Sequence, residues 1–144
     1  MKSPSQRLYL FAIALFALNV AATGLAIAVN WPAQFGGVGT DAGDEFLTRG
    51  TAISAPLFPM VLLMAVIVFA RRAGRLGWIA IVGAYLTVVV VFIGGMGELV
   101  AEPTEDTPKA VLVAAGIGWA IVAVELAYLA TKVVLDRRRP SVDA

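Results

Sequence analysis

AVLVAAGIGWAIVAVELAYLATKVVL, residues 110–135, decides the fold, because these 26 residues include only two charged side chains, Glu125 and Lys132. At 1.5 Å per residue such a helix is about 39 Å long, and the hydrocarbon core of a bilayer is about 30 Å thick. The stretch therefore predicts a transmembrane helix.

Three more apolar runs precede it, at residues 8–29, 52–70 and 78–100. Each is long enough to cross a bilayer, although the second only just reaches the required length. We therefore predict an all-α polytopic membrane protein, a bundle of four transmembrane helices that forms a single membrane domain over residues 1–144. The external loops are expected at residues 31–51 and 101–109.

The charges are separated between the two sides of this predicted bundle. Two bases, Arg49 and Lys109, fall in the external loops, whereas nine fall on the opposite side: Lys2, Arg7, Arg71, Arg72, Arg75, Lys132, Arg137, Arg138 and Arg139. Basic residues in short loops and tails stay in the cytoplasm, so both termini are predicted there. The same charges predict contact with anionic lipids of the cytoplasmic face.

Composition also suggests where the chain resides. Alanine, valine, glycine and arginine are frequent and lysine is rare, which favours a GC-rich bacterial genome and the bacterial inner membrane. The first run has an alternative interpretation as a cleaved signal peptide, since Lys2 and Arg7 precede it and Ala26 and Ala28 resemble a cleavage site. Its 22 apolar residues exceed the usual h-region of about 7–15, which favours a retained helix.

Missing residue types exclude several chemistries. The chain has no cysteine and no histidine, which removes thiolate metal sites, axial-histidine haem and Ser-His-Asp hydrolysis. We find no nucleophile beside a base and no cofactor or metal pattern, so an enzyme is not expected. The arginines at 137–139 are typical of a stop-transfer anchor and lack the aromatic stacking surface of nucleic-acid binders.

Glu125 is the most informative polar residue. An ionised carboxylate in the middle of a transmembrane helix costs on the order of 3 kcal/mol, so it must be partnered, hydrated or protonated. Counting twelve residues from the nearest cytoplasmic arginine places Asn19, Pro59, Thr87 and Glu125 at one level near the bilayer centre. We therefore hypothesise that Asn19 and Thr87 hydrogen-bond the Glu125 carboxyl. The alternative is that they only join helices, or that Thr87 bonds its own helix.

Pro56 and Pro59 predict a break in the second run, because each removes a backbone donor. One interpretation is a kinked but continuous helix. The other is a helix that begins near Ala55 with Ser54 as its cap, preceded by irregular backbone that must be buried in protein or line water.

Both faces of the last run are predicted to make contacts. Small residues form one stripe, at Gly116, Ala120, Ala123, Ala127 and Ala130, and the opposite face carries Glu125. Small stripes allow close helix approach, so this helix is expected between neighbours or against a second copy.

Two functions remain open. The first is a non-enzymatic membrane subunit that assembles with itself or with a partner membrane protein. The second is a small proton- or cation-coupled transporter that uses Glu125 as its titrating site, with Asn19 and Thr87 as its orienting residues and the break at Pro56 and Pro59 as its outer vestibule.

Overall fold

The computed structural model describes residues 3–33, 40–41, 46–51, 53–72, 74–101 and 108–138. Four helices account for most of them: α1 (Pro4–Ala28), α3 (Leu57–Ala70), α4 (Arg75–Val100) and α5 (Lys109–Arg138). Two short strands, β1 (Pro32–Ala33) and β2 (Thr40–Asp41), pair antiparallel with Pro32 opposite Asp41. The prediction of a helical fold is therefore confirmed, with this small hairpin as an addition.

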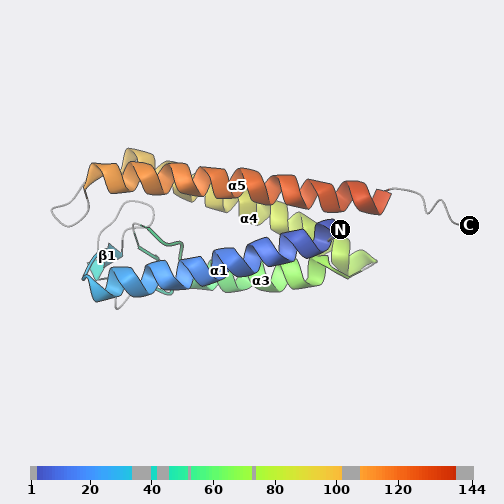
Figure 1. The fold of residues 1–144 in the computed structure, drawn as a ribbon, viewed down its shortest axis with the longest axis horizontal. Coiled ribbons are helices and arrows are strands. Elements are labelled where there is room, and N and C mark those ends of the chain that lie inside the picture. Colours follow the sequence, from blue (N-terminus) through green and yellow to red (C-terminus); the bar gives the residue numbers. More distant parts are fainter. Residues whose placement is uncertain are drawn as a thin grey trace, which may run out of the picture.

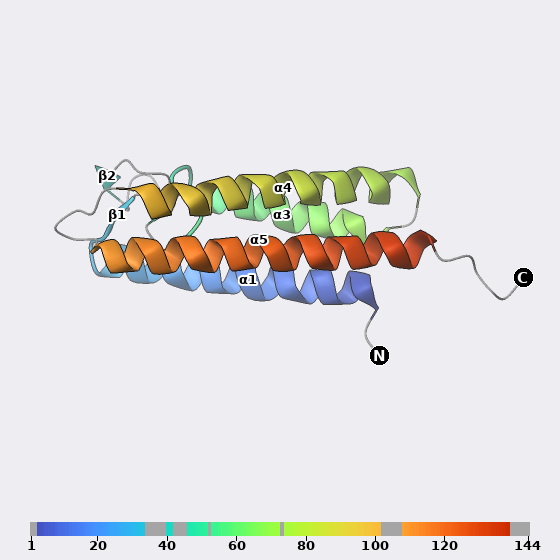
Figure 2. The same ribbon diagram turned by 90° about the horizontal axis from the view of Figure 1, so that it is seen from above.

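The helices form a ring in which α1 packs against α3 and α5, and α4 packs against the same two helices. Figures 1 and 2 show that α1 begins, and α5 ends, at the same end of the bundle as the turn between α3 and α4. We call this end the terminal end. The hairpin lies at the opposite end, which we call the loop end.

Three of these helices are long and apolar enough to cross a bilayer: α1, α4 and α5, with 25, 26 and 30 residues. Their outward side chains are apolar too, since Leu18, Ile79 and Leu86 are 68%, 67% and 64% exposed. Water-soluble monomers rarely carry such extensive apolar surface, whereas lipid tails accept it. The chain therefore has the build of a membrane protein.

The core runs along the axis of the ring. Each helix contributes buried apolar side chains, including Leu15 from α1, Leu63 from α3, Ile81 from α4 and Leu126 from α5. Because lipid is as apolar as leucine, close packing and interhelical hydrogen bonds, rather than exclusion of water, must hold these helices together.

The second predicted span is corrected by the structure. Instead of a transmembrane helix over residues 52–70, α3 has 14 residues, which at 1.5 Å each give about 21 Å, so four full spans are not established. Pro56 is the N-cap of α3 and Pro59 lies in its first turn, where a missing N–H costs nothing. The prolines thus start the helix rather than kink it, and the interpretation as a kinked continuous helix is wrong.

Carbonyl groups supplied by the chain itself complete the first turn of α3. Leu57 and Phe58 donate their N–H groups to the carbonyls of Phe46 and Leu47, at 3.3 and 3.1 Å. Ser54 does not cap this helix, because no side chain bonds its N-terminus. The turn at residues 46–49 therefore performs the capping that Ser54 was expected to perform.

The closest helix contact joins α4 and α5 at two glycines. A Cβ atom added to Gly95 would lie 2.8 Å from the Trp119 Cβ, and one added to Gly116 would lie 2.7 Å from the Gly95 carbonyl oxygen. Gly116, Ala123 and Ala130 of the small stripe are buried. At Gly116 the stripe makes the predicted close helix contact, and the neighbour there is α4.

Parts of the predicted external loops lie outside the described residues. These are positions 34–39 and 42–45 of the first loop and 102–107 of the second.

Candidate functional site

The three residues predicted to form one polar layer have different surroundings in the structure. Asn19 is buried on α1, Thr87 is half-buried on α4, and Glu125 is half-buried on α5. None of the hydrogen bonds between described residues joins any two of them. The three residues therefore do not form the predicted polar layer, and each has different neighbours.

Asn19 binds the backbone at the break before α3. Its Nδ2 donates to the Ala55 carbonyl at 3.1 Å, and its Oδ1 accepts from the Ala55 N–H at 2.8 Å. Both backbone groups of Ala55 are thus satisfied by one side chain that is 2% exposed. An amide is suited to this role, because it carries a donor and an acceptor on neighbouring atoms.

Hydroxyl groups extend this contact into a polar cluster, which we define as the side chains of Asn19, Thr23, Thr51 and Ser54. The Thr23 hydroxyl lies 2.9 Å from the backbone carbonyl oxygen of Asn19 and 2.9 Å from Ser54 Oγ. Thr51 Oγ1 and Ser54 Oγ are 2.7 Å apart. All four side chains are buried, so the cluster replaces the water that irregular backbone would otherwise need.

The backbone around the cluster turns back on itself. The Thr51 N–H donates to the Ser54 carbonyl at 2.9 Å, and the Ser54 N–H donates to the Thr51 carbonyl at 3.2 Å. Gly50 enters this turn with a φ of +69°, and a Cβ there would lie 2.5 Å from the Ser54 carbonyl oxygen. Only glycine fits this position without moving the turn.

The polar cluster lacks the groups needed for catalysis. Its members are an amide and three hydroxyls, and no histidine exists anywhere in the chain to act as a base. Its side chains form hydrogen bonds with buried backbone groups. Sequence reasoning identified Asn19 but missed Thr23, although Thr23 follows Asn19 by four residues and so lies on the same helix face.

Thr87 bonds its own helix. Its hydroxyl donates to the Gly83 carbonyl at 3.0 Å, which is the local alternative raised for this residue. Thr87 therefore has no need of Glu125 to satisfy its hydroxyl.

Glu125 lies toward the outer surface of α5. Its neighbours along that surface are well exposed, with Ile121 at 64%, Val124 at 65% and Tyr128 at 54%. Together with Leu99 of α4 and further α5 residues, Glu125 lines a shallow hollow of about 350 Å³; its lining is Leu99, Ile117, Ala120, Ile121, Val124 and Glu125. The carboxylate is the one charged group in this otherwise apolar lining.

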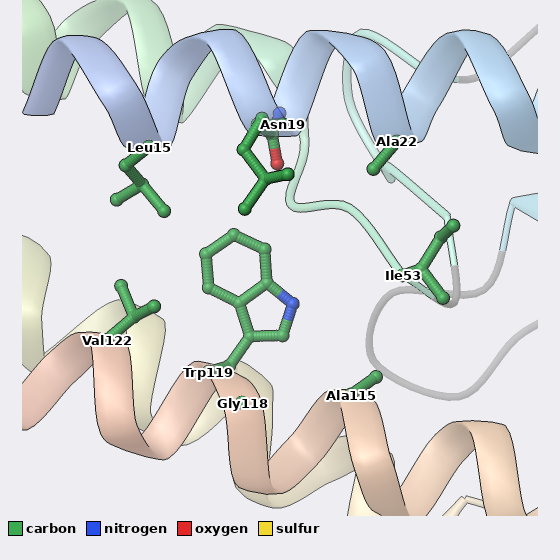
Figure 3. A pocket seen from close by; sticks show the side chains of 9 residues that line it. Leu15, Asn19, Ala22, Ile53, Ala115, Gly118, Trp119 and Val122 are labelled. Atoms are coloured by element: carbon green, nitrogen blue, oxygen red, sulfur yellow. The ribbon is translucent and has the colours of Figure 1, made fainter.

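A second cavity, of about 200 Å³, lies between α1, α5 and the turn before α3. Its lining is Leu15, Leu18, Asn19, Ala22, Ile53, Ala115, Gly118, Trp119 and Val122. Figure 3 shows the Trp119 ring projecting from α5 toward Asn19 on α1, with Ile53 approaching from the loop. We call this space the α1–α5 cavity.

Cationic side chains stack on aromatic rings at the terminal end. Arg71 lies 4.5 Å from the Tyr9 ring centroid and Arg137 lies 5.7 Å from that of Trp78. Arg137 also donates through Nη2 to the carbonyls of Ala70 and Arg72, the latter at 2.9 Å. It therefore closes the C-terminus of α3 from the end of α5.

Glu98 is a buried acid within the third apolar run, and it was not among the candidate residues expected from the sequence. It is 0% exposed near the end of α4 and takes part in an interaction there. At the same end, Lys109 Nζ donates to the carbonyls of Leu99 and Ala101, at 3.0 and 2.7 Å. The loop end is therefore held by polar contacts as well as by apolar packing.

The chain matches no family model, no curated protein and no solved structure.

Proposed function

We propose that the protein is a non-enzymatic subunit of the bacterial inner membrane that assembles with a second copy of itself through the outer face of α5. Both termini lie in the cytoplasm in this proposal. The position of Glu125 is the observation that carries it, because a half-buried carboxylate among exposed apolar side chains needs a partner from outside the bundle.

Hydrocarbon is an unfavourable environment for the Glu125 side chain. A carboxylate near the centre of a transmembrane helix costs on the order of 3 kcal/mol in hydrocarbon, so lipid alone is a poor neighbour for Glu125. Within the described residues, no hydrogen bond from the bundle satisfies its carboxyl group. A second protein surface removes the carboxyl from lipid and supplies hydrogen-bond partners.

A second copy is a suitable partner because a twofold interface brings the same residues of both chains together. Glu125 of one chain then lies near Glu125 and Tyr128 of the other, and the Tyr128 hydroxyl can donate a hydrogen bond to the opposing carboxyl group. The hollow beside Leu99 gives room for side chains of the opposing helix. The helix face at Gly116 is occupied by α4, which leaves the outer face for assembly.

The transporter alternative retains Glu125 but loses its proposed supports. Asn19 uses both ends of its amide on Ala55, and Thr87 is bonded to Gly83. The polar groups at the break before α3 are buried and bonded to one another, and the cavity beside them is lined mainly by apolar side chains, which disfavours a water-filled vestibule at that point. These contacts favour assembly over transport.

The basic terminal end supports the proposed orientation. The cation–aromatic pairs at Tyr9 and Trp78 place arginines beside amphipathic rings, an arrangement suited to the headgroup region. We propose that these arginines contact anionic lipids of the cytoplasmic leaflet.

Cysteine cross-linking tests the proposed interface, because the natural chain contains no cysteine. Ile121→Cys on α5 is compared in membranes with Leu86→Cys on α4, which is equally exposed at 64%. We expect a cross-linked dimer from Ile121→Cys and none from Leu86→Cys. Equal cross-linking at both positions would indicate random collision and would overturn the proposed interface.

Glu125 variants separate the two functions. In the Ile121→Cys background, Glu125→Leu is expected to reduce cross-linking about tenfold, because an interhelical polar contact contributes about 1–2 kcal/mol. Glu125→Gln retains hydrogen bonding and should retain the dimer. Proton flux from reconstituted vesicles that Glu125→Gln abolishes, with the dimer unchanged, would instead support the transporter.

A further inference from the structure

We propose that the α1–α5 cavity binds the acyl chain of a phospholipid. This inference depends on the membrane placement of the bundle and not on assembly through Glu125. The cavity lies between two helices that are each long enough to cross the bilayer, so hydrocarbon is the medium at its mouth.

The shape of the cavity matches a chain that lies along the bilayer normal. Its lining runs from Leu15 to Ala22 on α1 and from Val122 to Ala115 on the antiparallel α5. Seven residues of helix rise about 10 Å, which is most of the hydrocarbon depth of one leaflet. The cavity is therefore elongated in the direction in which lipid tails already lie.

The inner wall of the cavity is held in place by contacts outside it. Asn19 is fixed by its two hydrogen bonds to Ala55, and Trp119 is 6% exposed and belongs to the core. Ile53 lies in the turn braced by the paired backbone of Thr51 and Ser54. These walls cannot easily collapse, and an empty space between them would lose dispersion contacts.

The mouth is opened by small residues. Ala22 and Ala115 line opposite sides, and a Cβ added to Gly118 would meet no atom within 4 Å. The polar atoms of Asn19 are engaged with Ala55, so the space offered to a ligand is apolar. A dry cavity of about 150 Å³ already binds benzene, and this one measures about 200 Å³. It therefore accepts a segment of acyl chain rather than a headgroup.

The test measures phospholipid retained by the full chain after purification in a mild detergent, by native mass spectrometry and by lipid extraction. We expect wild type to retain stoichiometric phospholipid. Gly118→Leu fills the mouth from α5 and should reduce retention about tenfold. Gly24→Leu on α1 is the matched control, because a Cβ added to Gly24 likewise meets nothing within 4 Å and Gly24 does not line the cavity.

Ala22→Phe provides a second variant from the opposite wall, remote from the face that carries Glu125. It should also lose the lipid, and a phospholipid with a diazirine in its acyl chain should label wild type within 115–122 and 15–22. Wild type that retains no phospholipid, or Gly24→Leu that loses as much as Gly118→Leu, overturns the proposal. Retention of an isoprenoid in place of phospholipid overturns the assignment to an acyl chain.

Discussion

Asn19 shows how one side chain can make a broken helix tolerable inside a membrane protein. The two prolines prevent the helix from continuing past Pro56 toward the loop end, which exposes backbone groups at a depth where water is scarce. Asn19 satisfies both groups of Ala55, and Thr23 links the same cluster to Ser54. The residue therefore has a structural role that its apolar surroundings make necessary.

Asn19→Ala is expected to lower the free energy of unfolding by about 3 kcal/mol, because it leaves the N–H and C=O of Ala55 buried without partners. Reversible unfolding in mixed micelles with increasing SDS measures this change. Thr87→Val is the control and should cost about 0.5 kcal/mol, since the hydroxyl of Thr87 bonds only its own helix. An Asn19→Ala protein as stable as Thr87→Val would contradict the role given to Asn19.

Arg137→Gln is expected to loosen the turn between α3 and α4. The guanidinium donates to the carbonyls of Ala70 and Arg72, and hydrogen bonds from charged groups contribute about 1.5–3 kcal/mol each. Trypsin should then cleave after Arg72 about tenfold faster than in wild type. Arg138→Gln, at an exposed neighbouring position, should leave the rate unchanged; equal acceleration in both variants would argue against a specific closure.

The part of the second run that Asn19 approaches could be predicted from the sequence, but the backbone group that it bonds could not. Counting from the arginines placed Asn19 level with the Pro59 region, and Asn19 indeed bonds Ala55 beside that break. The count gives height along a helix and nothing about which neighbour a side chain faces. To predict whether Asn19 and Thr87 bond Glu125, the direction of each side chain around its helix must also be known.

At the scale of elements, the long apolar runs were sufficient to predict three helices that the structure contains. The second run was ambiguous because its composition is apolar throughout, while its backbone is interrupted by proline. Capping of α3 by the carbonyls of Phe46 and Leu47 is a tertiary contact, so local sequence could not indicate it. Hydropathy therefore overestimated the length of this helix.

Gly95→Ala tests the contact between α4 and α5. The added methyl would lie 2.8 Å from the Trp119 Cβ, so the helices must separate, at a cost of about 1–3 kcal/mol. Gly24→Ala is the matched control: its methyl meets nothing within 4 Å, and it should stabilise helix α1 by up to about 1 kcal/mol. If the two variants unfold at the same SDS fraction, the close approach at Gly95 does not limit stability.

At the scale of the whole molecule, α5 has two faces with different tasks. Gly116 on one face packs closely against Gly95 of α4, whereas the outer face carries Glu125 among exposed apolar side chains. The sequence already separated these faces by helical spacing, but only the packing shows which one is used within a single chain. We propose that a second copy of the chain binds the outer face.

The fraction of dimers at increasing dilution in lipid vesicles, measured by single-molecule photobleaching of labelled chains, tests this account most directly. Wild type should follow a monomer–dimer equilibrium, and Glu125→Leu should need about tenfold higher density to reach the same dimer fraction. Wild-type chains that remain single at every density, or a Glu125→Leu curve that coincides with that of wild type, would contradict assembly through Glu125.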